Sequence, residues 1–304
     1  MLDIVSDLAL VMRLIREYPL YTTGRERRAA FRRFLAWQVA GRVHAGPLCR
    51  DYVNGTQLLV KRRLGGRFPY VFGIPEFDDL LFAAHLLRKD EPFADVGANV
   101  GVYSVMAAAA AGARCEAFEP SPRAFRYLQD NVALNRLQGR IELHPWAVGA
   151  AAGQTQMTAA MGENNHVSAA GDKGEPVNVE VVTLDGFYAS RAAPLLLKMD
   201  VEGYETAVVD GAEQLLAACK PLALIVELAG VGPRYGFDEE KLHRRLVDFG
   251  YTACSYTALQ RRLEPFDPAL RYAGSTNVLF VRDLAEVKRR VQAAPAVEFG
   301  TYRI

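Results

Sequence analysis

One short segment, residues 93–104, constrains the fold of this 304-residue chain more than any other. Its first residues are apolar and suit a buried strand, its last residues suit the start of a helix, and a glycine turn lies between them. Asp95 is near the end of the strand part, and Gly97 and Gly101 are four residues apart in the turn. Because glycine adopts backbone angles that other residues avoid and carries no side chain, such a turn lets a charged ligand approach the backbone closely. The segment predicts a strand–turn–helix unit with a ligand site.

From residue 76 onward, strand-like and helix-like segments alternate along the chain. Core strands are expected at residues 91–96, 114–118, 140–148, 195–199 and 221–226, with helices after most of them, among them 204–218 and 238–249. Extra strands at 149–157 and 176–184 surround a polar loop, 162–174, and strands at 251–258 and 277–281 follow each other without a helix. This order predicts an α/β fold, a doubly wound, mostly parallel sheet with an antiparallel C-terminal strand and helices on both faces.

The first 72 residues do not follow that pattern. They are expected to form a mainly helical N-terminal extension with a short hairpin at 55–71 that turns at Gly65 and Gly66. The expected division of the chain is therefore 1–72 for the extension, 73–284 for the catalytic domain and 285–304 for a C-terminal tail.

One helix of the extension, within residues 24–39, carries Arg25, Arg28 and Arg32 at helical spacing on one side and aromatic residues on another. A basic helix with aromatic residues is suited to an anionic membrane surface. An ordinary helix docked on the main domain, with solvated arginines, explains the same pattern. The sequence leaves both interpretations open.

The overall charge and the cysteines limit the kind of protein. The formal net charge is only +1, so the composition gives no sign of a nucleic-acid partner. The four cysteines are scattered without a paired or metal-type spacing, which favours a reduced, cytoplasmic setting. The first residues include acids where a signal peptide needs a basic start, and no stretch approaches the roughly 20 apolar residues of a membrane span. We expect a soluble protein that contacts a membrane at most through its surface.

Acidic residues end four of the predicted strands: Asp95, Glu119, Asp200 and Glu227. In a parallel sheet these carboxyl ends meet at one edge, and ligands bind there near the switch in strand order. Four acids at one edge of an apolar sheet are poorly explained by stability alone.

Two ligand classes compete for the glycine turn. A dinucleotide needs a turn that accommodates a diphosphate, which a carboxylate such as Asp95 repels. S-adenosylmethionine carries an ammonium and a sulfonium, which the same carboxylate attracts. Glu119, 24 residues after Asp95, is placed to accept hydrogen bonds from both ribose hydroxyls. We therefore expect S-adenosylmethionine as the cofactor, with a nucleotide-dependent oxidoreductase or a non-catalytic scaffold as the alternatives.

A second cluster, residues 195–205, carries the residues expected to face the acceptor. Methyl transfer to a hydroxyl needs in-line alignment and removal of a proton. Asp200 is the first candidate to orient or deprotonate the acceptor, and Glu202, Glu227 and His166 are alternatives. The carboxylates are also oxygen ligands that a divalent metal accepts, although the sequence has no zinc motif.

Several segments together resemble the FkbM-type methyltransferase family. They are residues 95–101 (DVGANVG), 118–122 (FEPSP), 182–185 (VTLD), 198–205 (KMDVEGYE) and 226–227 (VE), and residues 73–76 (GIPE) and 277–280 (NVLF) extend the likeness. The resemblance implies a class I Rossmann-like fold, S-adenosylmethionine as cofactor, and transfer to oxygen on a sugar or another hydroxylated natural product. It implies a small-molecule or glycan acceptor and no nucleic acid.

The resemblance also implies roles by position. Cofactor contacts are expected at Asp95, Gly97, Ala98, Asn99, Gly101, Glu119 and Pro120, with Trp146 or Ala147 beside the adenine. Asp200, Glu202 and Glu227 are expected to face the acceptor.

Overall fold

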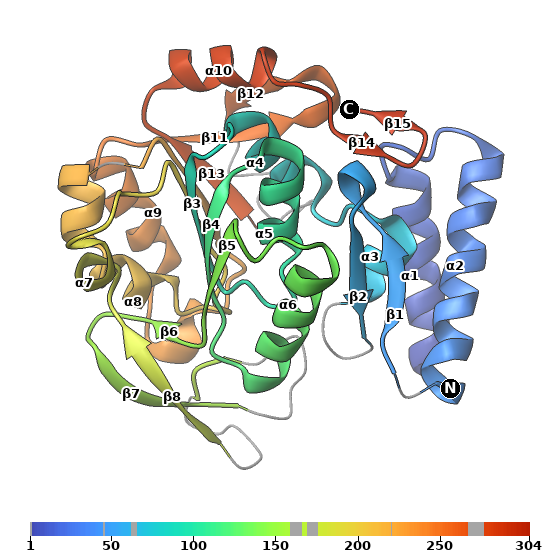
Figure 1. Cartoon of the computed structure of the whole chain (residues 1–304), viewed down its shortest axis with the longest axis horizontal. Coiled ribbons are helices and arrows are strands. Elements are labelled where there is room, and N and C mark those ends of the chain that lie inside the picture. The colour runs from blue at the N-terminus through green and yellow to red at the C-terminus, as the bar shows by residue number, and fades with distance from the viewer. Residues whose placement is uncertain are drawn as a thin grey trace.

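An eight-stranded sheet forms the centre of the computed structural model, which describes residues 2–44, 46–61, 66–158, 166–168, 176–219, 221–266 and 277–304. Its strands are β3 (Pro92–Val96), β4 (Arg114–Phe118), β5 (Ile141–His144), β9 (Leu196–Met199), β10 (Ala223–Glu227), β11 (Thr252–Thr257), β12 (Arg262–Pro265) and β13 (Asn277–Val281). They lie in the order β12–β11–β13–β10–β9–β3–β4–β5 (Figure 1).

The strand directions confirm the predicted α/β class. Strands β10, β9, β3, β4 and β5 run parallel, and β13 is antiparallel to both β10 and β11. The two strands expected at the end of the domain are present, but the sequence did not predict β12, which pairs with β11 at the edge of the sheet. Every parallel strand ends at the same edge, which brings the predicted acids to one side of the molecule.

The predicted strand 140–148 is divided in the structure. Its first part is β5, whereas β6 (Ala147–Val148) belongs to a separate three-stranded sheet with β7 (Gly153–Met157) and β8 (Val177–Val182). Pro145 lies between the two parts, and proline supplies no N–H to a sheet. The chain therefore leaves the central sheet at this point and places Trp146 at its edge.

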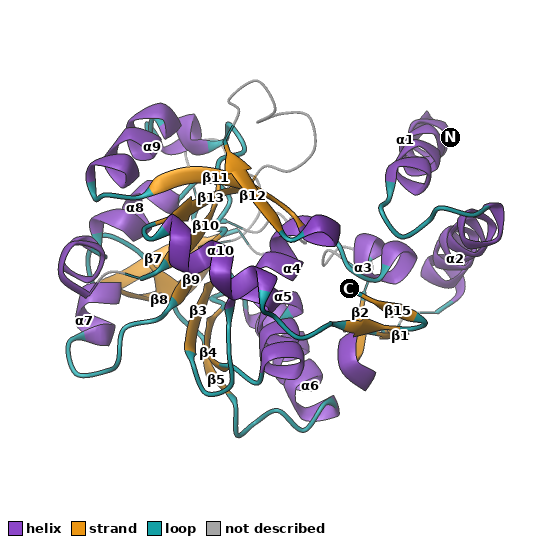
Figure 2. Ribbon diagram, turned by 90° about the horizontal axis from the view of Figure 1, so that it is seen from above, coloured by secondary structure: helices purple, strands orange, loops and turns teal. Residues whose placement is uncertain are grey.

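Helices cover both faces of the sheet, as predicted (Figure 2). One face packs against α4 (Phe77–Leu86), α5 (Val102–Met106), α6 (Pro122–Leu134) and α10 (Leu284–Gln292). The other packs against α7 (Leu184–Tyr188), α8 (Glu205–Asp210) and α9 (Glu239–Asp248). The helix expected at 204–218 is interrupted: α8 ends at Asp210, and after a turn at 211–212 the chain is helical again up to η4 (Leu215–Cys219). The turn lies where an added side chain at Gly211 would meet the Gly149 carbonyl oxygen at 2.1 Å, so the two backbones are in contact there.

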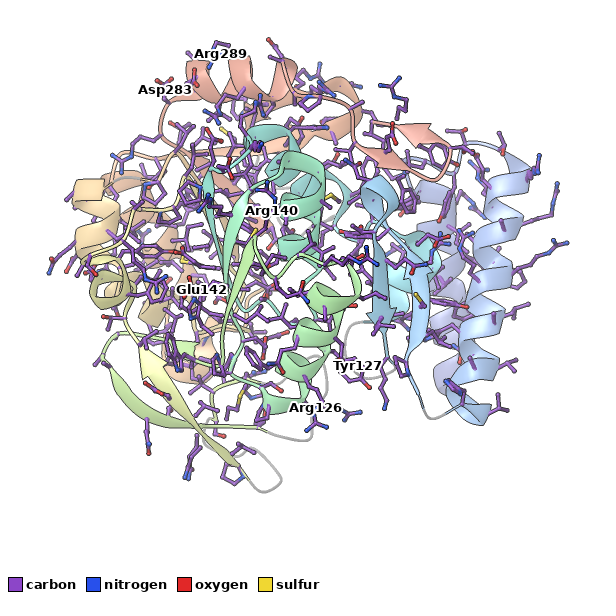
Figure 3. The ribbon with its side chains drawn as sticks, viewed as in Figure 1. Arg126, Tyr127, Arg140, Glu142, Asp283 and Arg289 are labelled. Carbon is purple, nitrogen blue, oxygen red and sulfur yellow. The ribbon has the colours of Figure 1, made fainter. Side chains whose placement is uncertain are left out.

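Helix α6 shows how sequence periodicity selects the buried side. Leu128 and Val132, four residues apart, are 0% and 1% exposed and face the sheet. Arg126 and Tyr127 lie on the outer side of the same helix (Figure 3). Ser121 caps the helix by accepting a hydrogen bond from the Ala124 N–H, as expected.

The N-terminal extension consists of α1 (Leu2–Glu17), α2 (Gly24–Val43), the hairpin β1 (Leu48–Asp51)–β2 (Gln57–Val60) and α3 (Arg67–Phe72). The predicted hairpin at 55–71 is wrong. The turn uses Asn54 and Gly55, both with positive φ, which is a common combination for tight turns, and residues 67–72 are helical. Of the predicted turn residues, Gly65 lies outside the described residues.

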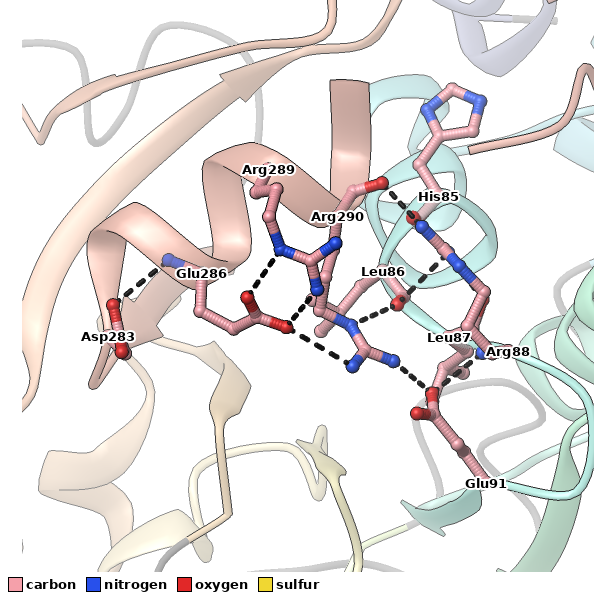
Figure 4. Close-up of polar contacts among 9 residues, drawn as sticks. All are labelled: His85, Leu86, Leu87, Arg88, Glu91, Asp283, Glu286, Arg289 and Arg290. Atoms are coloured by element: carbon pink, nitrogen blue, oxygen red, sulfur yellow. Dashed lines mark hydrogen bonds and ion pairs between the residues drawn. The ribbon is translucent and has the colours of Figure 1, made fainter. Parts of the chain in front are cut away.

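The C-terminal residues are part of the packed structure. The last hairpin, β14 (Glu298–Phe299)–β15 (Tyr302–Arg303), reaches the extension, where the Glu298 N–H donates to Asn54 Oδ1 (2.8 Å). Figure 4 shows how α10 is attached to the end of α4. Arg290 Nε donates to the Leu86 carbonyl (3.0 Å), and Arg88 Nη2 donates to the Arg290 carbonyl (2.5 Å). The three-part division of the chain stays a prediction.

Among the described residues, no helix combines the length and apolar character that crossing a membrane requires.

Candidate active site

The glycine turn between β3 and α5 is shaped by its contact with β9. An added side-chain carbon at Gly97 would lie 1.8 Å from the carbonyl oxygen of Asp200, so only glycine fits at this position. The N–H groups of Gly97 and Ala98 donate to the Phe118 carbonyl at 3.0 and 2.9 Å. Asn99 then adopts a left-handed conformation, with φ of 50°. The turn thereby brings the ends of β3, β4 and β9 into direct contact.

Glu119 at the end of β4 is held by the backbone of the turn. One carboxylate oxygen accepts the Asn99 N–H and the other accepts the Ser121 N–H, both at 2.8 Å. The residue is 7% exposed. Burial raises the pKa of Glu119 to about 7, although the two N–H groups oppose the shift. Its two oxygens keep further lone pairs for a ligand in the adjoining cavity.

Asp200 follows β9 and forms an ion pair with Lys198, with Asp200 Oδ2 2.9 Å from Lys198 Nζ. The two residues share a face, as the period of a strand predicts. Lys198 is only 2% exposed, and its ammonium also lies 4.7 Å from the centre of the Tyr103 ring. Although burial opposes it, the Asp200 and Asp95 carboxylates raise the pKa of Lys198. The ion pair fixes the orientation of the Asp200 carboxylate at the cavity.

Two candidate residues support the turn from behind instead of lining the cavity. Asp95 is 0% exposed, lies beside Lys198 in the sheet register, and accepts a hydrogen bond from Ser104 Oγ (2.6 Å). Gly101, with φ of 88°, packs against Leu128 of α6. The side chain of Asp95 therefore acts on the site through Lys198.

The carboxylates after β9 and β10 have different surroundings. Burial, followed by the carboxylates of Asp200 and Glu202, raises the pKa of Glu227 to about 10, so this carboxyl is protonated at neutral pH. Glu202 has a left-handed backbone, with φ of 58°. Glu205 is 2% exposed and accepts the N–H groups of Val201 (2.8 Å) and Gly203 (3.3 Å). Glu205 therefore shapes the loop, whereas Glu202 and Glu227 line the cavity.

The sequence analysis missed two polar residues of the site, Glu76 and Asn277. Glu76 Oε2 accepts hydrogen bonds from Tyr103 OH (2.6 Å) and Asn277 Nδ2 (2.9 Å). The Glu76 backbone is left-handed, with φ of 42°, and its side chain is exposed to the cavity that it borders. Desolvation of the Glu76 carboxyl by the neighbouring protein, followed by the negative charge of Asp200, raises the pKa of Glu76. Strain of this kind is concentrated at functional sites. The GIPE and NVLF segments were the only signal for these two residues.

The aromatic end of the cavity follows β5. The His144 ring stacks on Phe118 (4.8 Å between ring centres) and on Trp146 (5.0 Å). Burial lowers the pKa of His144, so the ring is neutral in this stack. Trp146 and Ala147 both border the cavity, in the region expected for adenine.

His166 is 3% exposed and borders the same cavity. The backbone N–H of His166 donates to Thr158 Oγ1 at 3.1 Å, and its backbone carbonyl accepts the backbone N–H of Thr158 at 2.9 Å. The remaining part of its loop, 159–165, lies outside the described residues.

One cavity of about 960 Å³ connects these residues. It is lined by most of the sequence candidates, namely Gly97, Ala98, Asn99, Glu119, Pro120, Trp146, Ala147, His166, Asp200, Glu202 and Glu227. Ligand pockets commonly have volumes of about 300–1,000 Å³, so this cavity lies near the upper end of that range. In the part of the chain that the structure describes, no group of three or more His, Cys, Asp or Glu side chains is arranged to hold a metal ion.

Comparison with known proteins points to one family. Residues 95–253 match the family described as the methyltransferase FkbM domain, which is more than half of the chain. A search of curated proteins found no match.

Several solved structures are similar to this chain at low sequence identity. A precorrin-6y C5,15-methyltransferase from Geobacter metallireducens is 13% identical, with a TM-score of 0.41 over 74% of this chain and 92% of its own. An rRNA methylase from Streptococcus thermophilus is 11% identical, with a TM-score of 0.40 over 66% of this chain and 91% of its own. A SAM-dependent O-methyltransferase from Thermotoga maritima is 12% identical, with a TM-score of 0.37 over 67% of this chain and 64% of its own. Likenesses this distant carry no argument about the acceptor.

Proposed function

The chain belongs to the FkbM methyltransferase family and is an S-adenosylmethionine-dependent methyltransferase; from that premise we propose that it methylates a hydroxyl of a sugar, glycolipid, polysaccharide or related natural product. The observation that carries the proposal is the contact between the glycine turn and the Asp200 backbone. It places a carboxylate paired with Lys198 beside the cofactor-binding turn. The oxidoreductase and scaffold alternatives have no comparable support.

The residues of the cavity fit the cofactor. Asn99 Oδ1 is buried, and within the described residues it has no hydrogen-bond partner, so it is ready to accept a bond from a ligand. Glu119 would accept the ribose hydroxyls, and the stack ending in Trp146 would border the adenine. The Ala98 and Pro120 backbones complete this wall. S-adenosylmethionine, when bound, supplies a methyl group made electrophilic by its sulfonium.

The acceptor chemistry is assigned to Asp200. Its carboxylate would accept the hydroxyl proton as the acceptor oxygen becomes a nucleophile, and Lys198 would hold that carboxylate in place. Glu227, protonated at neutral pH and hydrogen-bonded to Asp200, would help to hold the Asp200 carboxylate instead of acting as a base. Glu202 and His166 would contribute to acceptor binding from the cavity wall.

The acceptor side favours an uncharged, hydroxylated molecule. Glu76, Asp200 and Glu202 border the cavity there beside the neutral Glu227 carboxyl, and Lys198 is the cation that pairs with Asp200. Carboxylates accept hydrogen bonds from hydroxyls but repel phosphates. We therefore propose a small-molecule or glycan acceptor and not a nucleic acid.

A comparison of metabolites tests this proposal. Deletion of the gene is expected to leave one hydroxylated glycan or lipid product lighter by one methyl group, and labelled methyl from S-adenosylmethionine should be recovered as an O-methyl sugar after acid hydrolysis. Label found in nucleic acid or on nitrogen would contradict the proposal.

Cofactor binding is expected to depend on pH through Glu119. Since its pKa is about 7 in the free protein and the ionised form accepts the ribose hydroxyls, binding releases a proton. The dissociation constant should fall about tenfold between pH 6 and pH 8, because the ionised fraction of Glu119 rises from about one tenth to about nine tenths over this range. Calorimetry at several pH values measures this, and Glu119→Gln should flatten the profile. The same profile in both proteins would assign the proton to another group.

We also propose that α2 contacts an anionic membrane surface. Arg25, Arg28 and Arg32 are exposed on a stripe that continues with Leu35 (47% exposed) and Val39 (60% exposed). The aromatic residues Phe34 and Trp37, by contrast, are buried against the protein. The stripe proposed to contact the membrane therefore consists of arginine and aliphatic side chains. Each basic residue near an anionic surface contributes about 1 kcal/mol.

Flotation of the whole chain with vesicles tests the membrane contact. The protein should float with phosphatidylserine-containing vesicles and not with neutral ones, and changing Arg25, Arg28 and Arg32 together to Glu should abolish flotation. Equal recovery of both proteins in the unbound fraction would remove this proposal.

A further inference from the structure

Part of the cavity lining comes from the N-terminal extension and is mostly apolar; we call it the apolar end. It contains Leu14, Tyr18 and Pro19, from α1 and the residues after it, and Phe68 and Phe72 of α3. Glu17, which is exposed, also borders the cavity here. The cofactor assignment above uses none of these residues.

The side chains of the apolar end are held in place by hydrogen bonds and ring contacts within the protein. Tyr18 OH donates to the Ile74 carbonyl (2.9 Å), so α1 is attached to the segment that leads into Glu76. The Tyr18 and Phe72 rings are 5.2 Å apart, and Phe68 and Phe72 are stacked at 5.9 Å. Tyr21 OH also bonds the Phe72 carbonyl at 3.0 Å. Side chains fixed in this way form a binding surface without a cost for ordering them.

The apolar surface continues out of the cavity along α1. Leu10 lies four residues before Leu14, hence on the same helical face, and it is 37% exposed. Phe68, across the cavity, is also 37% exposed. We call the surface formed by Phe68, Tyr18, Leu14 and Leu10 the apolar track; it is open to solvent at Phe68 and Leu10, and its inner residues line the same cavity as the carboxylates. A compact ring would fill the inner part of this track only, whereas a chain would follow its whole length.

We propose that this track binds the apolar chain of a lipid-linked acceptor, whose hydroxylated headgroup lies against the carboxylates of the cavity. This rests on the proposed transfer to a hydroxyl, and it adds the substrate class. The headgroup is held by hydrogen bonds to carboxylates at one end, and the chain is removed from water at the other. The N-terminal extension is then a specificity element for the lipid.

Binding of simple glucosides to the whole protein tests the track without any turnover. Octyl, phenyl and methyl β-glucoside share one headgroup, so differences in affinity report on the apolar group. Each buried methylene contributes about fourfold in affinity. In the presence of S-adenosylhomocysteine, and below the micelle concentration, octyl glucoside should bind at least about 30-fold more tightly than methyl glucoside and clearly more tightly than phenyl glucoside.

Matched variants locate the effect. Phe68→Ser combined with Leu10→Ser should remove most of the preference for the octyl group, and both positions are exposed enough for the fold to tolerate the change. Leu134→Ser, at a similarly exposed position on α6, should retain the preference. Equal affinity for octyl and methyl glucoside, equal affinity for octyl and phenyl glucoside, or equal effects of the two variants would overturn the proposal. None of these results would bear on O-methyl transfer, which the metabolite comparison tests separately.

Discussion

Replacement of Asp200 by Asn is expected to lower the rate of methyl transfer by about 10²–10⁴-fold, the usual contribution of a general base. The amide keeps the size of the side chain and cannot take the hydroxyl proton. Lys198 would lose the partner that now lies 2.9 Å away, so the side chain would also be less well oriented. The rate is measured by transfer of labelled methyl from S-adenosylmethionine into glycan and lipid extracts of cells that lack the gene.

Two controls separate catalysis from binding and folding. Asp130→Asn changes an exposed carboxylate on α6 and should leave the rate unchanged. The affinity of Asp200→Asn for S-adenosylhomocysteine should stay close to that of the wild type, because the assigned ribose and adenine contacts are untouched. A normal rate in Asp200→Asn would contradict the role of this residue. The scaffold alternative predicts that Asp200→Asn leaves the biological role intact.

Replacement of Glu119 by Ala is expected to weaken the binding of S-adenosylmethionine by at least tenfold and up to about 10⁴-fold. Hydrogen bonds to a charged group contribute about 1.5–3 kcal/mol each, and Glu119 is assigned two ribose hydroxyls. The substitution also releases the N–H groups of Asn99 and Ser121, which loosens the turn. Calorimetry with the cofactor and with S-adenosylhomocysteine gives the affinities.

The control for this change is Glu180→Ala, which removes an exposed carboxylate on β8. It should bind the cofactor as the wild type does. Thermal unfolding of both variants distinguishes a lost contact from a lost fold. Unchanged affinity in a folded Glu119→Ala protein would remove Glu119 from the cofactor site.

The part of the site that was predictable depends on local geometry. Residues at a strand end and two positions apart must share a face and an edge, so Lys198 and Asp200 could be placed together from the sequence. The order of strands and helices then places Glu119, Asp200 and Glu227 at one edge of a parallel sheet. Short-range periodicity and the handedness of the connections are therefore enough to predict that these residues lie at one edge of the sheet.

The rest depends on contacts between distant segments. Glu76 and Asn277 are 201 residues apart, and they meet because β13 runs antiparallel beside β10, which no local pattern reveals. A left-handed backbone at Glu76 is equally hidden, since this conformation is unfavourable for a glutamate in isolation. The resemblance also suggested Asp95 as a direct cofactor contact. In the structure the Asp95 side chain instead accepts a hydrogen bond from Ser104, and Asp95 is the neighbour of Lys198 in the sheet.

Determination of the complex with S-adenosylhomocysteine by crystallography tests the central claim most directly. The account predicts that both ribose hydroxyls lie within hydrogen-bond distance of the Glu119 carboxylate, that the adenine lies beside Trp146, and that the sulfur faces Asp200. A nucleoside bound elsewhere, or bound with its ribose away from Glu119 and its sulfur away from Asp200, would contradict it.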